Sequence, residues 1–174
     1  YLIPPVLILG MAQRLVKTLC PGGGKKTPVE GSMKEMLEQQ FVDLPKEFHK
    51  DIPSLSEVYR IEQTPECPAG TRGRVAVYEM FTMTLELERA ILANKPEDEL
   101  FGLVRKSGML TMKEDAIIKA AQGVIPFEEV NTLGGEFELE GPEIEPPPPV
   151  ILGEDASEVK GSEKKAPADK EIQV

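Results

Sequence analysis

The chain of 174 residues is poor in the residue types that build large aromatic cores and disulfide frameworks. It has no tryptophan, three tyrosines, six phenylalanines, one histidine and two cysteines. Any core must therefore be mostly aliphatic, with few large anchors. Two cysteines far apart in sequence do not make the disulfide framework of a small secreted protein, so we expect a reducing, cytoplasmic setting.

The chain also lacks an excess of basic residues and a long apolar run. Its 20 Lys and Arg stand against 30 Asp and Glu, for a net charge of −10. A nucleic-acid partner would require a basic face, so we expect none. The apolar segment at residues 2–12 is shorter than the about 20 residues that span a bilayer, and it lacks the basic start of a signal peptide. We interpret it as the lead-in to a buried helix.

Acidic residues and prolines are concentrated in residues 134–174. This segment holds eleven acidic and four basic side chains, together with the proline run at residues 146–149. Such a composition cannot bury enough apolar area to offset the entropy of ordering, so we expect a disordered tail. A polyproline segment can also bind a partner, which is the functional alternative to a solvated terminus.

Helical spacing and helix breakers organise the first seventy residues. Apolar residues at that spacing predict a buried helix over residues 6–19, which Pro21 ends. A loop then leads to a short helix that Ser32 can cap, with Glu35 completing a capping box. We interpret residues 20–70 as a small inserted subdomain rather than part of the core.

The second half of the chain predicts one strand and four helices. Residues 74–80 alternate with β-type side chains, which is typical of a strand. Capping and breaking residues then divide the following segment into helices. These signals are Thr82 or Thr84, Pro96, Gly108, the capping box from Thr111 to Glu114, Gly123 and Pro126.

The glycine run at residues 22–24 superficially suggests a phosphate-binding loop. Such a loop needs G-x-x-x-x-G-K-[ST] after a strand, so that backbone amides and a lysine surround the phosphates. Here Leu19 stands where the first glycine is required, and a helix rather than a strand is expected before the run. We therefore interpret the segment as an ordinary loop.

Four sequence pieces occur in an order that is typical of one protein family. They are A-Q-R-L-V-K-T-L-C-P at residues 12–21, C-P-A-G at residues 67–70, G-R-V-A-V-Y-E-M-F at residues 73–81 and S-G-M-L-T-M-K-E-D at residues 107–115. The family pattern is A-Q-R-L-V-R-x-L-C-P, a second cysteine pair, G-R-x-x-I-Y-E-V and G-M-x-T-L-x-E-D-G. Over about residues 1–133, the chain thus resembles the C-terminal end of the type II secretion and type IV pilus-assembly ATPases.

This resemblance implies a mixed α/β fold, mainly helical in this chain, with four parts. Residues 1–19 correspond to the end of a RecA-like ATPase core, and residues 20–72 to a reduced insert similar to a zinc knuckle. Residues 73–133 correspond to a strand with a helical C-terminal module. The family pattern does not explain the acidic tail at residues 134–174.

The function that the resemblance implies is that of a motor. Members of the family form rings, usually hexamers, that use ATP hydrolysis to power type II secretion or type IV pilus assembly. Such a ring lies in the cytoplasm at the inner face of the membrane, where its partner is an inner-membrane platform. The Walker motifs and Mg-site residues precede the matched segment, so ATP and Mg²⁺ are expected in the parent protein and no activity from this chain alone. The start at Tyr1 favours a fragment; the alternative is a non-catalytic interaction module derived from such an ATPase.

Gln13 and Arg14 belong to the first family motif and follow closely on the family's nucleotide-binding segment. By resemblance they would lie near the nucleotide or at a subunit interface, where the fork of an arginine suits phosphate or carboxylate. A polar helix face held by local ion pairs explains them equally well. Glu114 and Asp115 look like paired carboxylates, but a place in the first turn of a helix accounts for both.

Cys20 and Cys67 occupy the positions of the family's zinc ligands. Many members carry C-x-x-C at both places and so form a four-thiolate zinc site, but here Gly23 and Gly70 stand at the partner positions. His49 could add a third ligand, although its spacing does not require it. Because structural zinc takes four ligands, two cysteines make a poor site. We expect a degenerate knuckle without metal.

Overall fold

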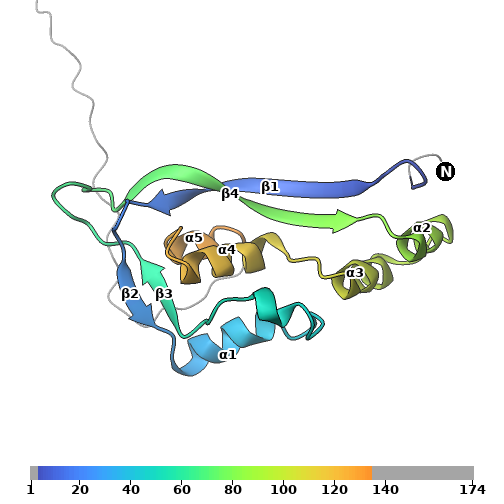
Figure 1. Cartoon of the computed structure of the whole chain (residues 1–174), viewed down its shortest axis with the longest axis horizontal. Coiled ribbons are helices and arrows are strands. Elements are labelled where there is room, and N and C mark those ends of the chain that lie inside the picture. Colours follow the sequence, from blue (N-terminus) through green and yellow to red (C-terminus); the bar gives the residue numbers. More distant parts are fainter. Residues whose placement is uncertain (1–3, 135–174) are drawn as a thin grey trace, which may run out of the picture. The chain divides into compact units, whose positions relative to one another are not determined.

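The computed structural model describes residues 4–134, all within one compact unit, Tyr1–Glu143. This part contains two antiparallel two-stranded sheets and five α-helices (Figure 1), which confirms the predicted mixed α/β class. The tail predicted over residues 134–174 lies outside the described residues, apart from its first residue. In chain order the elements are β1 (Leu9–Leu19), β2 (Lys25–Pro28), α1 (Gly31–Gln40), the 3-10 helix η1 (His49–Asp51), β3 (Glu57–Arg60), β4 (Thr71–Thr82), α2 (Leu85–Leu92), α3 (Glu97–Lys106), α4 (Met112–Ala121) and α5 (Glu128–Asn131).

β1 is a strand, so the prediction of a helix over residues 6–19 was wrong. It pairs antiparallel with β4 along almost its whole length. The residues at helical spacing do not form a buried face, because Met11 and Leu15 are exposed. The side chain of Val16, which is not part of this spacing, is buried instead. Helix propensities differ by only tenths of a kcal/mol per residue, so a long strand partner outweighs them.

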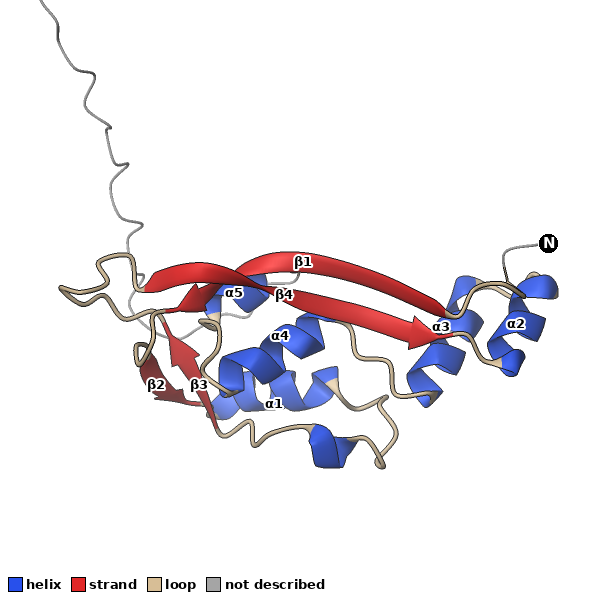
Figure 2. Ribbon diagram, turned by 45° about the horizontal axis from the view of Figure 1, so that its top comes forward, coloured by secondary structure: helices blue, strands red, loops and turns tan. Residues whose placement is uncertain are grey.

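β4 confirms the predicted strand and extends it beyond residues 74–80 at both ends. Val77 points inward and is fully buried. In both overall views the β1–β4 ribbon runs along one side of the molecule, with α4 packed against it (Figure 2). The other side of the ribbon carries the exposed apolar side chains Met11, Leu15 and Met80.

Residues 20–70, interpreted from the sequence as a small inserted subdomain, contribute side chains to the main core. Leu37, Phe41 and Val58 from this segment are buried in one cluster with Val77 of β4 and Ile117 of α4. The same segment contains the small sheet in which β2 pairs with β3. Aliphatic side chains from the two halves of the chain therefore share one hydrophobic core.

The expected capping box at the start of α1 was also wrong. The helix begins at Gly31, one residue before Ser32, and its N-cap is Glu30 without a side-chain cap hydrogen bond. Gly31 has φ of 57°, a left-handed conformation that glycine adopts without a steric penalty. Ser32 consequently lies inside the first turn, where its hydroxyl cannot act as the N-cap.

The helices after β4 follow the predicted order, and α2 and α4 have the expected threonine caps. Thr84 is the N-cap of α2, and its Oγ1 accepts a hydrogen bond from the Leu87 N–H at 3.2 Å. At α4, the Glu114 N–H donates to Thr111 Oγ1 at 3.3 Å, and the Thr111 N–H donates to Glu114 Oε2 at 2.7 Å. Both halves of the predicted capping box are thus present.

A second, smaller apolar cluster joins α2 and α3. Its buried members are Leu87, Val104 and Met109, with Phe81 at the end of β4 packed against them. Within residues 4–134, none of the helices has both the length and the apolar character to cross a membrane.

Candidate functional site

Cys20 and Cys67 meet where β1 ends and the segment leading into β4 turns. Cys20 directly follows the last residue of β1. Cys67 lies in a turn, where its N–H donates to the Thr64 carbonyl at 3.0 Å. The two cysteines form a disulfide, with their Cα atoms 6.6 Å apart. Sequence reasoning had not expected this pairing, which arises because the paired ends of β1 and β4 bring the two residues together.

The residues around this pair do not fit a four-thiolate zinc site. Gly23 and Gly70 supply no ligand, and a disulfide leaves no thiolate to bind metal. His49 is used elsewhere, since its Nε2 lies 2.9 Å from the Leu44 carbonyl oxygen. Among the residues that the structure describes, no three His, Cys, Asp or Glu side chains are grouped to hold a metal ion.

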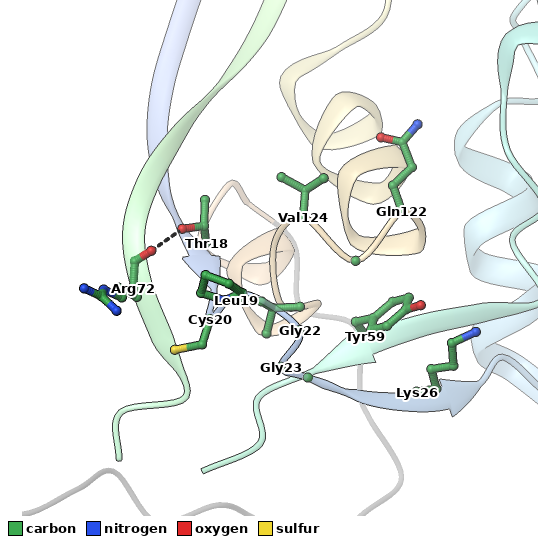
Figure 3. Close-up of a pocket in the computed structure, with 13 residues that line it drawn as sticks. Thr18, Leu19, Cys20, Gly22, Gly23, Lys26, Tyr59, Arg72, Gln122 and Val124 are labelled. Atoms are coloured by element: carbon green, nitrogen blue, oxygen red, sulfur yellow. Dashed lines mark hydrogen bonds between the residues drawn. The ribbon is translucent and has the colours of Figure 1, made fainter. Parts of the chain in front are cut away.

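A cavity of about 830 Å³ opens at the glycine turn that follows β1. Figure 3 shows Arg72 and Cys20 on one side of it and Tyr59 and Lys26 on the other. A second cavity, of about 370 Å³, shares Cys20 and Arg72 with the first. Cys20 and the glycine turn therefore line both hollows.

The cations at these cavities are not arranged as a phosphate cradle. Lys26 Nζ lies 2.7 Å from Glu57 Oε1, and this hydrogen bond raises the pKa of the Lys26 ammonium. The smaller cavity is lined by Arg72 but also by Glu62 and Glu66. A phosphate group would thus meet carboxylates as well as cations.

The structure corrects one reason for rejecting a phosphate-binding loop at residues 22–24. A strand, β1, does precede the glycines, where sequence reasoning had expected a helix. However, the run leads into the short strand β2 and not into a helix. A phosphate-binding loop places the phosphate at the N-terminus of the helix that follows it. Because a strand follows the glycines here, the segment is still interpreted as an ordinary loop.

Gln13 and Arg14 lie in the middle of β1, opposite Tyr78 and Val77 of β4. Both side chains are exposed, and neither lines the cavities beside Cys20. Within residues 4–134, no carboxylate lies within ion-pair distance of Arg14. The structure therefore keeps these two residues apart from the cysteine pair, and their role near a nucleotide stays a prediction.

A buried ionic cluster around Arg105 escaped sequence reasoning. Arg105 Nη1 lies 2.9 Å from Glu114 Oε2, and Nη2 lies 2.6 Å from Glu114 Oε1. Arg105 Nε also donates to Asp43 Oδ2 at 3.1 Å, and Nη1 donates to the Met109 carbonyl. The cluster ties the segment after α1 to α3 and α4. No local pattern could have revealed it, because Asp43 and Arg105 are 62 positions apart.

The electrostatics of this cluster favour the charged states of Arg105 and Asp43. Burial disfavours the charge on Arg105, but its hydrogen bonds to Asp43 and Glu114 outweigh burial and raise the pKa of the guanidinium. The hydrogen bond from Arg105 lowers the pKa of the Asp43 carboxyl. Glu114 also closes the capping box of α4, so one carboxylate serves both the helix end and the ion pair.

Asp115 likewise has a structural partner. Its Oδ2 accepts a hydrogen bond from the Tyr78 N–H at 2.9 Å, on the edge of β4 that faces away from β1. It also pairs with Lys119 one helical turn later. The two adjacent carboxylates of α4 therefore have separate contacts and do not form an acid/base pair.

Comparison with known proteins supplies the family. A model of the family described as "Type II/IV secretion system protein" matches residues 2–132. The type II secretion system protein E of Xanthomonas campestris is 41% identical over 73 residues, which cover 42% of this chain and 13% of that protein. The type IV pilus assembly ATPase PilB of Pseudomonas aeruginosa is 31% identical over 121 residues, covering 70% of this chain and 20% of PilB.

A third relative has the same partial coverage. The type II secretion system ATPase E of Vibrio cholerae is 30% identical over 131 residues, which cover 75% of this chain and 24% of that protein. The chain thus spans no more than about a quarter of the length of these relatives. Because the family match extends over most of the chain and the motifs keep their order, the chain belongs to the type II/IV secretion system protein family.

Proposed function

We propose that this chain is the C-terminal part of a hexameric motor ATPase that powers type II secretion or type IV pilus assembly, and that the nucleotide site lies outside it. The observation that carries the proposal is the family match over residues 2–132, together with relatives whose names describe secretion and pilus ATPases. ATP and Mg²⁺ would bind elsewhere in the parent, at the inner face of the membrane, where an inner-membrane platform would be its partner.

Within that parent, residues 1–19 would end the ATPase core, residues 20–72 would be the reduced insert, and residues 73–133 would close the structure. The exposed apolar side of the β1–β4 ribbon supports this division. Met11 is 59% exposed and Leu15 is 62% exposed, although both are large apolar residues on a strand. An apolar face of this kind marks a contact surface. The role of the chain would then be packing and contact between subunits.

Reading the coding sequence upstream of Tyr1 tests the proposal directly. An open frame with G-x-x-x-x-G-K-[ST] after a predicted strand would support a motor ATPase that ends in this chain. A stop codon close upstream, with a start codon between, would contradict it. The chain would then be a non-catalytic interaction module derived from such an ATPase.

The parent protein then allows a biochemical test of the packing role. We expect Met11→Asp with Leu15→Asp to lower both ATP hydrolysis and the hexamer fraction seen by analytical ultracentrifugation, because two charges would enter a buried contact. Val42→Asp is the matched control, since Val42 is 79% exposed in the turn that follows α1. Equal ATP hydrolysis and equal ring assembly in all three proteins would contradict the packing role.

A further inference from the structure

The disulfide between Cys20 and Cys67 lies within reach of small molecules. Both cysteines are half-buried, and Cys20 lines the larger cavity as well as the smaller one. A disulfide in a packed core would be closed to a second thiol, because thiol–disulfide exchange requires direct access to one of the two sulfurs. The position of this bond beside two cavities therefore allows a thiol in solution to attack it.

The two cavities differ in the charged side chains that line them. Among the described residues, those that line the larger cavity include Arg72 and Lys26 but no Asp or Glu. The smaller cavity is also lined by Arg72, together with the carboxylates of Glu62 and Glu66. An anionic molecule is therefore attracted to the larger cavity and repelled by the carboxylates of the smaller one.

Arg72 is the cation of the larger cavity that is available to a ligand. It lies on the same side of this cavity as Cys20 (Figure 3). Within residues 4–134 no carboxylate lies within ion-pair distance of Arg72, whereas the Lys26 ammonium is held by Glu57 at 2.7 Å. The planar fork of an arginine fits one carboxylate with two hydrogen bonds. A thiol that carries a carboxylate can thus be held beside the Cys20 sulfur.

The larger cavity has room for a thiol of the size of a short peptide. Its volume of about 830 Å³ lies in the range of about 300 to 1,000 Å³ that is typical of small-molecule sites. The glycines at residues 22–24 line it without side chains, so a ligand can approach the backbone closely. Glutathione, a tripeptide with two carboxylates, one ammonium group and one thiol, suits both this volume and the positive charge of Arg72.

Contacts around the disulfide hold both cysteines in place when the bond opens. Leu19, directly before Cys20, is paired with Thr71 of β4. The Cys67 N–H donates to the Thr64 carbonyl at 3.0 Å. The Thr71 carbonyl oxygen lies 3.8 Å from Cys67 Sγ, where it can accept a weak hydrogen bond from a thiol. The two sulfurs therefore stay close enough for the bond to form again.

We propose that the disulfide between Cys20 and Cys67 is an exchange site for a small anionic thiol of the glutathione class, which binds in the larger cavity. The ligand thiolate attacks Cys20 Sγ and forms a mixed disulfide with it. The bond between the two cysteines breaks, and its electron pair leaves with Cys67 Sγ, which takes a proton from water. A second thiolate attacks the ligand sulfur of the mixed disulfide and releases Cys20 as a thiolate. In total, two ligand thiols are oxidised to one disulfide and the two cysteines are reduced.

This inference goes beyond the proposed function and does not depend on it. Exchange frees residues 61–70, the segment between β3 and β4, from its covalent link to the end of β1. The ratio of thiol to disulfide in the surroundings then sets the fraction of molecules in which the two are joined. Disulfides within reach of a reducing thiol pool are transient and redox-sensing rather than structural.

The rate at which glutathione opens the disulfide in the folded 174-residue chain tests the proposal. Free thiols are blocked with N-ethylmaleimide at each time point, and mass spectrometry follows the loss of the disulfide. We expect Arg72→Gln to slow the reaction by about three- to fivefold, which is the size of one exposed ion pair. Arg74→Gln is the matched control, because Arg74 is also exposed on β4 but lines neither cavity. With cysteamine, a cationic thiol, Arg72→Gln should react no more slowly than the unchanged protein.

Two single-cysteine variants test which sulfur is attacked, even where the mixed disulfide of the unchanged protein closes again too quickly to be trapped. Oxidised glutathione should modify Cys20 in Cys67→Ser faster than it modifies Cys67 in Cys20→Ser, because only Cys20 lines the larger cavity. Faster modification of Cys67 would overturn the proposal. Equal glutathione rates in the two arginine variants, equal slowing with cysteamine, or a disulfide that glutathione opens only in urea would each overturn it as well.

Discussion

Arg105 and Glu114 form a two-point ion pair inside the protein, with their side chains only 4% and 2% exposed. The two nitrogen–oxygen distances, 2.9 and 2.6 Å, describe a guanidinium that faces both oxygens of one carboxylate. The pair joins the C-terminal turn of α3 to the first turn of α4. It therefore fixes the angle between two helices whose connection contains Gly108 with φ of 86°.

Replacing Arg105 with methionine should destabilise the protein strongly. The change leaves Glu114 buried without its partner, and breaking a buried pair in this way costs about 3 kcal/mol or more. Urea unfolding followed by circular dichroism measures the loss. Arg89→Met is the control, because Arg89 is exposed near the end of α2. A loss no greater than that of the control would show that the pair contributes little.

Removing both partners should cost less than removing one. In Arg105→Met with Glu114→Leu no charge stays buried, so the double variant should recover part of the stability lost in Arg105→Met. The same urea titrations give the coupling between the two sites. The prediction fails if the double variant is less stable than the single one, although Glu114→Leu also removes one half of the capping box.

The stability that Asp43 contributes should disappear at low pH. Its folded pKa lies below the ordinary value of 3.8, because Arg105 donates a hydrogen bond to the carboxylate. A depressed folded pKa gives stability that is fully present above the ordinary value and is lost as the pH falls through the folded pKa. The difference in stability between the unchanged protein and Asp43→Asn should therefore be constant from pH 7 to 5 and should shrink below about pH 4. A difference that persists at pH 2 would contradict this origin.

The disulfide between Cys20 and Cys67 should make stability depend on reductant. The two cysteines are 47 positions apart in the sequence. A disulfide that closes such a loop contributes about 2 to 4 kcal/mol to the free energy of unfolding. Dithiothreitol should lower the urea midpoint of the unchanged protein and leave that of Cys20→Ser with Cys67→Ser unaffected. Two free thiols per chain in the untreated native protein would contradict the pairing, and a further stabilisation by zinc would show that the thiolates bind metal instead.

Removing the cap of α4 should have a smaller, separable effect. Thr111→Ala deletes the oxygen that accepts from the Glu114 N–H, and the loss of an N-cap costs about 1 kcal/mol. Thr111→Ser keeps an oxygen at the same place and should stay close to the unchanged protein in thermal unfolding. If serine and alanine lower the melting temperature equally, the threonine methyl and not the hydrogen bond matters at this position.

The elements that sequence reasoning placed correctly are those with local signals. Thr84 and Thr111 begin helices because each side-chain oxygen satisfies an N–H three residues later, which depends on no distant residue. Gly108 and Gly123 end α3 and α4 in left-handed conformations, which glycine adopts freely. The four family motifs are also local, so the family could be identified before the fold.

The errors concern segments whose structure depends on a distant partner. Residues 6–19 carry apolar side chains that suit either a helix or a strand, and β4, whose residues pair with β1 from far along the chain, decides for the strand. The capping box expected at Ser32 failed because the backbone enters α1 one residue earlier, where Gly31 takes a positive φ. A short pattern contains no information on the distant strand that pairs with residues 9–19, nor on the conformation of Gly31.

Composition, caps and motif order were therefore sufficient for the helices after β4, for β4 and for the family, because each depends on residues within a few positions. The tertiary structure alone decided that Cys20 meets Cys67 and that Arg105 joins Asp43 to Glu114. These relationships follow from strand pairing and helix packing between segments that are tens of residues apart. Such contacts form only when the whole core forms, and so no local stretch of sequence specifies them.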